Sequence, residues 1–529
     1  MKSNCIPIIL IATASTLIMA SCSGDNVREP DPTTVEASSE LDVEFTKAVE
    51  EYIATDWGTW DDGENLGRCL TANVNSMTVE TKQAVIKYGI EEAFNELSGI
   101  HVQSLSNVWD SCQTDIPTTA TSQSEPIAEV KSSPTTQLIT FESNSAYENF
   151  SDDAELQFKD AIDQHFDRLT EKAGISVAVY KEGYLWRYAK GRASPTENMK
   201  IGTPTLFRSS SKTFVAAIVL QQIDAGLYSL SDTLHSILSG NDDYESFDKN
   251  VINPDVTIHH LLTMTSGIAD AHDYSRKEHT DVQTNPVWTP GDTVKLATRP
   301  FVSPGVYDYS NTNTMLLGMI VEEVAQENLN AVYKSQLFDP LGLIALLLPQ
   351  DNAPPNTARP YGDRTNYGGS GFGDLSEASS WVTDWYESTG RTSWAAAGIV
   401  TTPENLAKWA YELFSIHGRA ISSTSHAIFL DSFTDPMIEI GGWPQQYGYH
   451  ATKRSMTLSN DDITVYGHPG GGGGYTSVFY YSPEVDLSIS LLANSHSNAR
   501  NREESVGRLT HRTLGDIGQR LFDIYKSTR

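Results

Sequence analysis

Apolar residues are distributed unevenly along the 529 positions, and two regions have the pattern of folded structure. Within 41–115 they recur at helical spacing, which predicts a small helical module. From 147 to 529 helix and strand patterns alternate, and this length predicts a second, larger domain. Segments 22–40 and 116–146 are rich in Ser, Thr and Pro, so we expect a disordered tether and a linker there.

The larger domain begins and ends with patterns that predict strands. The expected elements are a helix over 154–172, a hairpin over 175–189, a buried helix over 214–220, a second hairpin over 475–493 and a final helix over 503–525. Because the strands at the two ends enclose the helices, the pattern predicts an α/β (α+β) fold. Its sheet would be assembled from distant parts of the chain.

The run 214–220 is apolar on every side, which is why we expect a buried helix. The motif Ser-Ser-Ser-Lys stands directly before it, at 209–212. Residues three apart lie on one face of a helix, so the Lys212 amine can reach the Ser209 hydroxyl. This pairing suits a nucleophile that is activated without histidine. The N–H groups and the dipole at a helix start also favour a developing anion.

A second Ser-x-x-Lys pair, Ser246 and Lys249, has the same spacing. It follows the acidic segment 241–245, which we expect to be a loop with no buried helix behind it. The helical context therefore favours Ser209 over Ser246 as the nucleophile.

The charge of the chain excludes one class of partner. There are 37 Lys and Arg residues against 68 Asp and Glu, which gives a net charge of −31. Nucleic-acid binding needs a basic surface, so we expect no nucleic-acid partner. The histidines show no persuasive ligand spacing, so we expect neither a metal nor another cofactor.

Residues 1–21 have the pattern of a signal peptide, in which Lys2 precedes an apolar stretch over 6–20. The small residues before Cys22 resemble a bacterial lipoprotein box, which implies lipidation of Cys22 and a membrane anchor. Ser23 then favours the outer membrane of the cell envelope, with the protein facing the periplasm. Cleavage with release as a secreted protein and an uncleaved anchor are the alternatives.

Cys69 and Cys112 remain in the mature chain after Cys22. In an oxidising compartment we expect them to form a disulfide within the helical module. Closing the loop between them would add roughly 4 kcal/mol of stability on the chain-entropy model.

Two further motifs follow the serine motif, Tyr-Ser-Asn at 309–311 and His-Pro-Gly at 468–470. Each motif alone has an ordinary explanation, such as a cap or a turn. Ser-x-x-Lys, Tyr-x-Asn and His-x-Gly in this order resemble the penicillin-recognising serine hydrolases. They are most similar to the class C β-lactamase-like branch, and within it to secreted D-alanyl-D-alanine carboxypeptidases. Flanking segments at 257–267 and 394–403 agree, and the resemblance covers about 150–529.

This resemblance implies an antiparallel sheet of about five strands, flanked by helices, with an added helical subdomain. It implies that Ser209 attacks a carbonyl carbon and forms an acyl-enzyme. Lys212 and the Tyr309 phenol would share the proton transfers, and which of them is the general base stays open. Asn311 would hold the substrate amide.

The third motif supplies the remaining contacts that the resemblance implies. His468 would orient the substrate carboxylate or the leaving group, and would not act as a triad base. Gly470 would line the substrate site. The N–H groups of Ser209 and Gly471 would form the oxyanion hole, which is worth roughly 10²–10³ in rate per donor.

Arg454, or its neighbour Lys453, is the candidate for binding a C-terminal carboxylate. The chain also departs from the family pattern. Arg208 precedes the nucleophile where a small residue is usual, and Met264 stands where a histidine is common. Neither departure removes a catalytic group.

We therefore expect a serine hydrolase, most directly a penicillin-binding D-Ala-D-Ala carboxypeptidase that acts on peptidoglycan stem peptides. Its partners would be a small peptide or β-lactam substrate and peptidoglycan. A β-lactamase, a D-aminopeptidase or an esterase of the same family is the alternative. A non-enzymatic lipoprotein that binds the wall or senses β-lactams is a further one, and intact Ser209, Lys212 and Tyr309 argue against it.

Overall fold

The chain divides into two compact units, Met1–Pro134 and Thr135–Arg529. The computed structural model describes Phe45, Lys47, Lys82, Gln83, Val85 and residues 140–142, 145–170, 173–272, 282, 285, 288–364, 371–378, 385–440, 442–497 and 507–529. The fold and site presented below therefore belong to the second unit.

Several predictions fall outside the described residues. They are the signal peptide, lipidation at Cys22, the tether, the Cys69–Cys112 disulfide and nearly all of the module and linker. No helix in the described part of the chain is long and apolar enough to cross a membrane.

The second unit combines many strands with many helices. Its strands are β1 Gly174–Lys181, β2 Tyr184–Gly191, β3 Thr205–Leu206, β4 Leu346–Leu347, β5 Tyr361–Asp363, β6 Phe372–Asp374, β7 Ile399–Thr401, β8 Thr434–Ile440, β9 Trp443–Tyr447, β10 Thr452–Thr457, β11 Asp462–Gly467, β12 Gly470–Gly472, β13 Tyr475–Ser482 and β14 Leu487–Ala493. Its helices are α6 Asp152–Asp167, η3 Arg208–Ser211, α7 Lys212–Asp224, α8 Leu234–Leu238, α9 Asp242–Glu245, α10 Ile258–Leu262, α12 Pro290–Val294, α13 Asn311–Ala325, α14 Leu329–Tyr333, η4 Lys334–Phe338, α15 Asp339–Leu341, α16 Leu375–Ala378, α17 Trp385–Ala397, α18 Pro403–Phe414, α19 Ser423–Asp431 and α20 His511–Ser527.

The main sheet joins the two ends of this unit. Its order is β2-β1-β14-β13-β11-β10-β9-β8, and β12 pairs with β13 beside this path. All of these pairs are antiparallel, and Ile175 of β1 stands opposite Ala493 of β14. The α/β (α+β) class is therefore confirmed, as is the assembly of the sheet from distant segments.

The expected number of about five strands was too low, since the described sheet has nine. Strands β13 and β14 are buried at every position and give strong apolar signals. Strands β10 and β11 instead alternate buried with more exposed residues. Their polar outward residues dilute the apolar pattern. The sequence pattern therefore did not predict these strands, and it gave no reason to raise the number implied by the resemblance.

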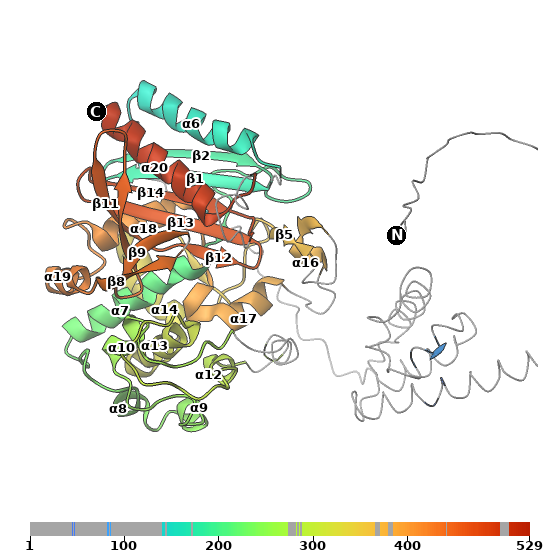
Figure 1. Ribbon diagram of the computed structural model, residues 1–529, viewed down its shortest axis with the longest axis vertical. Coiled ribbons are helices and arrows are strands. Elements are labelled where there is room, and N and C mark those ends of the chain that lie inside the picture. Colours follow the sequence, from blue (N-terminus) through green and yellow to red (C-terminus); the bar gives the residue numbers. More distant parts are fainter. Residues whose placement is uncertain are drawn as a thin grey trace, which may run out of the picture. The chain divides into compact units, whose positions relative to one another are not determined.

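Two layers of helices enclose the sheet. Helices α6 and α20 cover one face, while α18 and the region that contains α7 and α13 lie against the other (Figure 1). Side chains alternate across the sheet, as β13 illustrates. Tyr480 belongs to the core under α6 and α20, whereas Phe479 and Tyr481 belong to the core on the α18 side.

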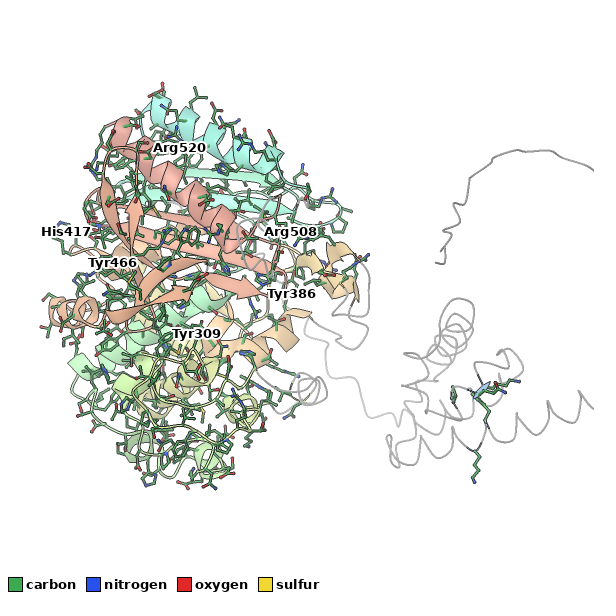
Figure 2. The ribbon with its side chains drawn as sticks, in the orientation of Figure 1. Tyr309, Tyr386, His417, Tyr466, Arg508 and Arg520 are labelled. Carbon is green, nitrogen blue, oxygen red and sulfur yellow. The ribbon has the colours of Figure 1, made fainter. Side chains whose placement is uncertain are left out.

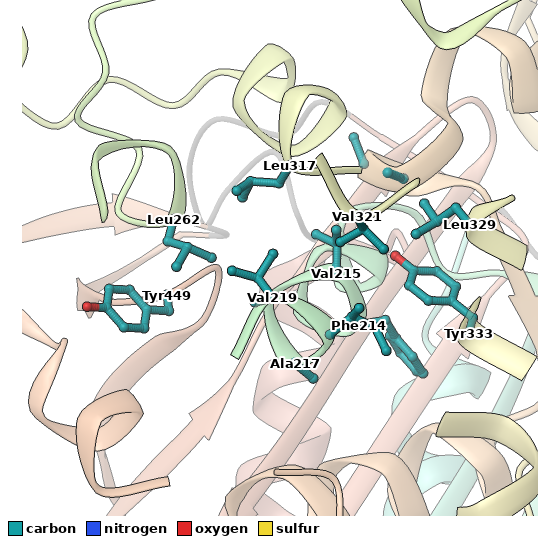
Figure 3. Close-up of a cluster of buried hydrophobic side chains, with 14 of the residues drawn as sticks. Phe214, Val215, Ala217, Val219, Leu262, Leu317, Val321, Leu329, Tyr333 and Tyr449 are labelled. Atoms are coloured by element: carbon teal, nitrogen blue, oxygen red, sulfur yellow. The ribbon is translucent and has the colours of Figure 1, made fainter. Parts of the chain in front are cut away.

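Helix α7 runs through the larger core and is buried on all sides, as its sequence predicted (Figure 3). The ring of Phe214 stacks on that of Trp409 of α18, with centroids 3.9 Å apart. The helix ends at Asp224, and Gly226 follows its C-cap with a φ of 72°, a conformation that glycine adopts without strain. The start of α7 is thus anchored in the core, and this start carries the serine motif.

Both predicted hairpins are confirmed, as β1–β2 and β13–β14. The first and last predicted helices exist but are shorter, since α6 ends at Asp167 and α20 begins at His511. The acidic segment 241–245 was wrongly expected to be a loop. Asp242–Glu245 forms the short helix α9, and the Asn241 side chain caps its N-terminus.

Candidate active site

Ser209 and Lys212 meet at the junction of η3 and α7. The lysine Nζ donates to Ser209 Oγ over 3.2 Å, as the spacing of three residues predicted. Arg208 enters this turn with a φ of 56°, which is unfavourable for a residue with a side chain. Surrounding contacts must therefore hold the turn in place.

The two middle serines of the motif supply such contacts. Ser210 Oγ donates to the carbonyl oxygen of His468 over 2.8 Å and lies 2.9 Å from Ser477 Oγ. Ser211 Oγ accepts from the backbone N–H of Ile399 over 3.2 Å. The turn is thus tied to the third motif, to β13 and to β7. The partners in these contacts lie 258, 267 and 188 residues apart along the chain, so the contacts form only when the tertiary structure does.

The Lys212 amine lies fully buried among hydrogen-bond acceptors. Besides Ser209, it donates to Asn311 Oδ1 over 2.6 Å and to the Ala396 carbonyl oxygen over 3.0 Å. Asn311 is the first residue of α13 and Ala396 lies near the end of α17. Three separate segments therefore fix the position of the amine.

Burial lowers the pKa of Lys212 to about 7, because the ammonium loses its hydration. The positive charge of Arg208 lowers this pKa further, and the negative charge of Asp270 opposes it. A large share of the amine is therefore neutral at neutral pH. A neutral amine that contacts a serine hydroxyl can accept its proton.

Asp270 is the charged partner of this arrangement. Its Oδ2 accepts from Asn311 Nδ2 over 2.8 Å, and its Oδ1 accepts from the Asn311 and His272 backbone N–H groups over 3.2 and 3.0 Å. Burial raises the pKa of Asp270, but the hydrogen bonds and charge of His272 and the charge of Lys212 outweigh it and leave this pKa below its ordinary value. Asn311 therefore bridges an amine and a carboxylate. The expected contact of Asn311 with the substrate stays a prediction.

Tyr309 completes the group beside Ser209, near the boundary between the sheet and the helical region (Figure 2). The Lys212 Nζ lies 5.1 Å from the centroid of its ring. Burial raises the pKa of the Tyr309 phenol above its ordinary value, although a hydrogen bond with Ser209 acts the other way. The phenol is therefore protonated at neutral pH and can donate a proton.

His468 lies in an aromatic group with the tyrosines, and its side chain is buried. Its Nδ1 is 2.6 Å from the Pro469 carbonyl oxygen, so this nitrogen carries the proton. Its Nε2 is 3.2 Å from the Tyr447 hydroxyl and accepts from it. Burial and the charge of Lys212 lower the pKa of His468 to about 3, so the ring is neutral. Both ring nitrogens are engaged by protein groups.

Strand β12 passes directly beside the serine turn. A Cβ atom on Gly470 would lie 2.1 Å from the Phe207 carbonyl oxygen and 3.0 Å from the backbone nitrogen of Ser209. Only glycine allows this approach. The backbone of β12 is therefore close enough to Ser209 for an oxyanion hole, while the participation of the Gly471 N–H stays a prediction.

Arg454 lies on the wrong face of the sheet for its predicted role. Its guanidinium is buried 4.5 Å from the Trp443 ring and 5.1 Å from the Tyr480 ring, on the side that α20 covers. Ser477, which contacts the serine turn, points to the opposite face, because successive residues of a strand alternate. The expectation that Arg454 binds a substrate carboxylate thus needs correction. Its neighbour Lys453 has its Nζ 6.0 Å from the Tyr466 ring, which belongs to the other core.

Ser246 and Lys249, the competing pair, each form contacts with residues close to them in sequence. Ser246 Oγ donates to the Asp243 carbonyl oxygen over 2.5 Å. Lys249 donates to the Tyr244 carbonyl oxygen, and its Nζ lies 3.5 Å from the centroid of the Tyr244 ring. These contacts agree with the preference for Ser209.

Sequence reasoning missed Asp270 and two histidines, His496 and His511, which lie beside Gly471. Asp270 stands three positions after the Thr-Ser-Gly segment that resembles the family, and this was the only signal available. His511 was simply part of the final helix. Contacts across such distances in sequence leave no periodic pattern. Among the described residues no group of His, Cys, Asp and Glu side chains could hold a metal ion.

Comparison with known proteins identifies the family. Residues 162–510 match the family model described as Beta-lactamase, which is well over half of the chain. The chain belongs to the Beta-lactamase family. It is therefore a serine hydrolase of the penicillin-recognising group, and the resemblance carried by the three motifs is confirmed.

Relatives and solved structures agree with this family. The chain is 25% identical over 344 residues to penicillin-binding protein 4 of Amycolatopsis lactamdurans, covering 63% of this chain and 84% of that protein. D-amino acid amidase from Ochrobactrum anthropi SV3 has the same fold, with a TM-score of 0.58, 19% identity, and coverage of 71% and 99%. A D-stereospecific amidohydrolase from Streptomyces sp. aligns with a TM-score of 0.50 and 22% identity over 65% and 94% of the two chains. At these identities the structures establish the fold alone.

Proposed function

We propose that this β-lactamase-family hydrolase removes the terminal D-alanine from peptides that end in D-Ala-D-Ala, by way of an acyl-enzyme on Ser209. One observation carries the proposal. A fully buried Lys212 amine, with a pKa lowered to about 7, donates to Ser209 Oγ over 3.2 Å. The similarity to a penicillin-binding protein supports this choice of substrate.

Lys212 in its neutral form is the general base of this proposal. It takes the Ser209 proton as Oγ bonds to the carbonyl carbon, which leaves a tetrahedral oxyanion. Tyr309 does not act as a second base, because its raised pKa keeps the phenol protonated. The phenol gives its proton to the leaving nitrogen as the C–N bond breaks, and it recovers one from Lys212. Water then releases the acyl group by the same steps.

A carboxypeptidase also needs a cation for the substrate's terminal carboxylate, and we propose Arg208 in place of Arg454. Arg208 directly precedes the nucleophile, and a Cβ atom on Gly472 would lie 3.7 Å from its Nη2. Its guanidinium therefore borders both the serine turn and β12. We expect Arg208→Gln to raise KM for a peptide with a free carboxylate and to leave KM unchanged for the same peptide with an amide end.

The first test is labelling with a fluorescent penicillin, followed by mass spectrometry of the modified peptide. The adduct is expected on Ser209 and should be lost in Ser209→Ala, while Ser246→Ala keeps it. An adduct elsewhere, or labelling that survives Ser209→Ala, would overturn the proposal.

Hydrolysis of D-amino-acid amides is the second candidate. An amide substrate has no terminal carboxylate, so this reaction needs neither Arg454, which lies away from the site, nor Arg208 as a binding partner. The shared fold with the D-amino acid amidase is compatible with it. A panel of D-Ala-D-Ala peptide, D-amino-acid amides, nitrocefin and p-nitrophenyl esters separates these activities. A kcat/KM at least tenfold higher for the amides than for the dipeptide end would select the second candidate.

We further propose that the protein is a lipoprotein of the cell envelope, anchored through Cys22 and facing the periplasm. The box ending at Cys22 supports this location. Metabolic labelling with a palmitate analogue should mark the wild-type chain and not Cys22→Ser. Equal labelling of the wild-type chain and Cys22→Ser would contradict the proposed lipid anchor at Cys22.

A further inference from the structure

His511 lies at the first position of α20 and reaches β12. Its Nε2 is 2.8 Å from the carbonyl oxygen of Gly470. A carbonyl oxygen can only accept, so this nitrogen carries the proton and donates. Burial lowers the pKa of His511, which keeps the ring in this neutral, singly protonated form.

The acceptor belongs to a particular peptide unit. The C=O of Gly470 and the N–H of Gly471 are the two ends of one amide, and this N–H is the proposed oxyanion donor. A hydrogen bond to the oxygen of an amide polarises the whole unit and strengthens its N–H as a donor. His511 thus contacts the oxygen end of this peptide unit, while the N–H end of the same unit would bind the oxyanion.

The packing leaves little freedom for this peptide. A Cβ atom on Gly471 would lie 2.6 Å from Cε1 of His511 and 2.9 Å from Cε1 of His496. On the other side, the Cβ position of Gly470 is 3.0 Å from the nitrogen of Ser209. The strand is therefore clamped between the histidines and the serine turn.

We propose that His511 is a positioning residue of the oxyanion hole, where its hydrogen bond to Gly470 orients and polarises the Gly470–Gly471 peptide. The proposal rests on the acyl-enzyme mechanism proposed above. It does not depend on which acyl group Ser209 carries.

The test compares two variants of similar volume, His511→Gln and His511→Met. A glutamine amide can donate to the Gly470 oxygen and methionine cannot. Acylation by nitrocefin or a fluorescent penicillin is followed by stopped flow, and the ester carbonyl band of the acyl-enzyme by infrared difference spectroscopy. The matched control is His426→Met, because His426 Nε2 of α19 lies 2.9 Å from the Phe414 carbonyl oxygen at the end of α18, and neither residue belongs to the contacts described for the site.

In His511→Met we expect the acylation rate to fall about tenfold, less than the 10²–10³ for loss of a whole oxyanion donor. The carbonyl band should move to higher wavenumber, since the ester oxygen is less polarised. His511→Gln should keep most of the rate and the band, and His426→Met all of both. A merely structural role would not move the band.

Two results would overturn the inference. One is an unchanged rate and band in His511→Met, and the other is an equal loss in the Gln and Met variants, which would indicate a packing role. Failure of the mechanism itself looks different, because Ser209 would then carry no adduct in the wild-type enzyme. Circular dichroism confirms that both variants fold.

Discussion

The opposing charges around Lys212 make a sharp prediction about pH. If neutral Lys212 is the base, kcat/KM should rise with pH through its pKa of about 7. About a tenth of the amine is neutral at pH 6 and about nine-tenths at pH 8, so kcat/KM should rise roughly tenfold between them.

Asp270→Asn removes the negative charge that favours the ammonium form of Lys212. The amine and the carboxylate are linked through the Asn311 side chain by hydrogen bonds of 2.6 and 2.8 Å. At a separation of ~7 Å and an effective dielectric constant of ~20, the two charges interact by ~2 kcal/mol. This corresponds to ~1.5 pKa units. The pH at the midpoint of the rise in kcat/KM (the acid limb of the profile) should therefore move from about 7 to between about 5 and 6.

Arg208→Gln should shift the midpoint the other way, because it removes a positive charge that lowers the Lys212 pKa. Asp308→Asn is the control, since this carboxylate precedes Tyr309 but is exposed and screened by water. The assay is the pH profile of kcat/KM for a substrate that does not ionise between pH 5 and 9. Asp270→Asn also disturbs the contacts of Asn311, so the plateau should fall, and the midpoint is the diagnostic quantity.

Two outcomes would refute this reasoning. If the midpoint of the kcat/KM profile is unchanged in both Asp270→Asn and Arg208→Gln, the rise with pH does not reflect titration of Lys212. A wild-type limb above pH 9 would point to the Tyr309 phenol as the base instead.

Three further changes test the surroundings of the site. Gly470→Ala should abolish acylation by penicillin in a folded protein, because its Cβ would lie 2.1 Å from the Phe207 carbonyl oxygen; normal labelling would contradict the close approach of β12. Phe214→Ala should lower the free energy of unfolding by about 3–5 kcal/mol, measured by urea denaturation, since it removes a ring stacked on Trp409. A loss under 1 kcal/mol would show that this core is loosely packed. Arg208→Gly should raise stability by about 1 kcal/mol, because glycine accepts the φ of 56° without strain, and a loss of stability would show that the side-chain contacts of Arg208 outweigh that strain.

The sequence by itself determined the fold class, both hairpins, the buried helix α7 and the pairing of Ser209 with Lys212. These features depend on short-range patterns. An apolar run predicts a buried helix, and a spacing of three residues on a helix brings two side chains together.

Tertiary structure alone decided the electrostatics of the site and the faces of the sheet. The pKa of Lys212 depends on burial and on the charges of Asp270 and Arg208, and Asn311 at the start of α13 hydrogen-bonds to both Lys212 and Asp270. Arg454 was misplaced because one residue of register in β10 decides which face it occupies, and sequence does not fix that register. His511 meets Gly470 only because α20 packs beside β12. Such long-range contacts are set by the completed sheet and carry no local signal.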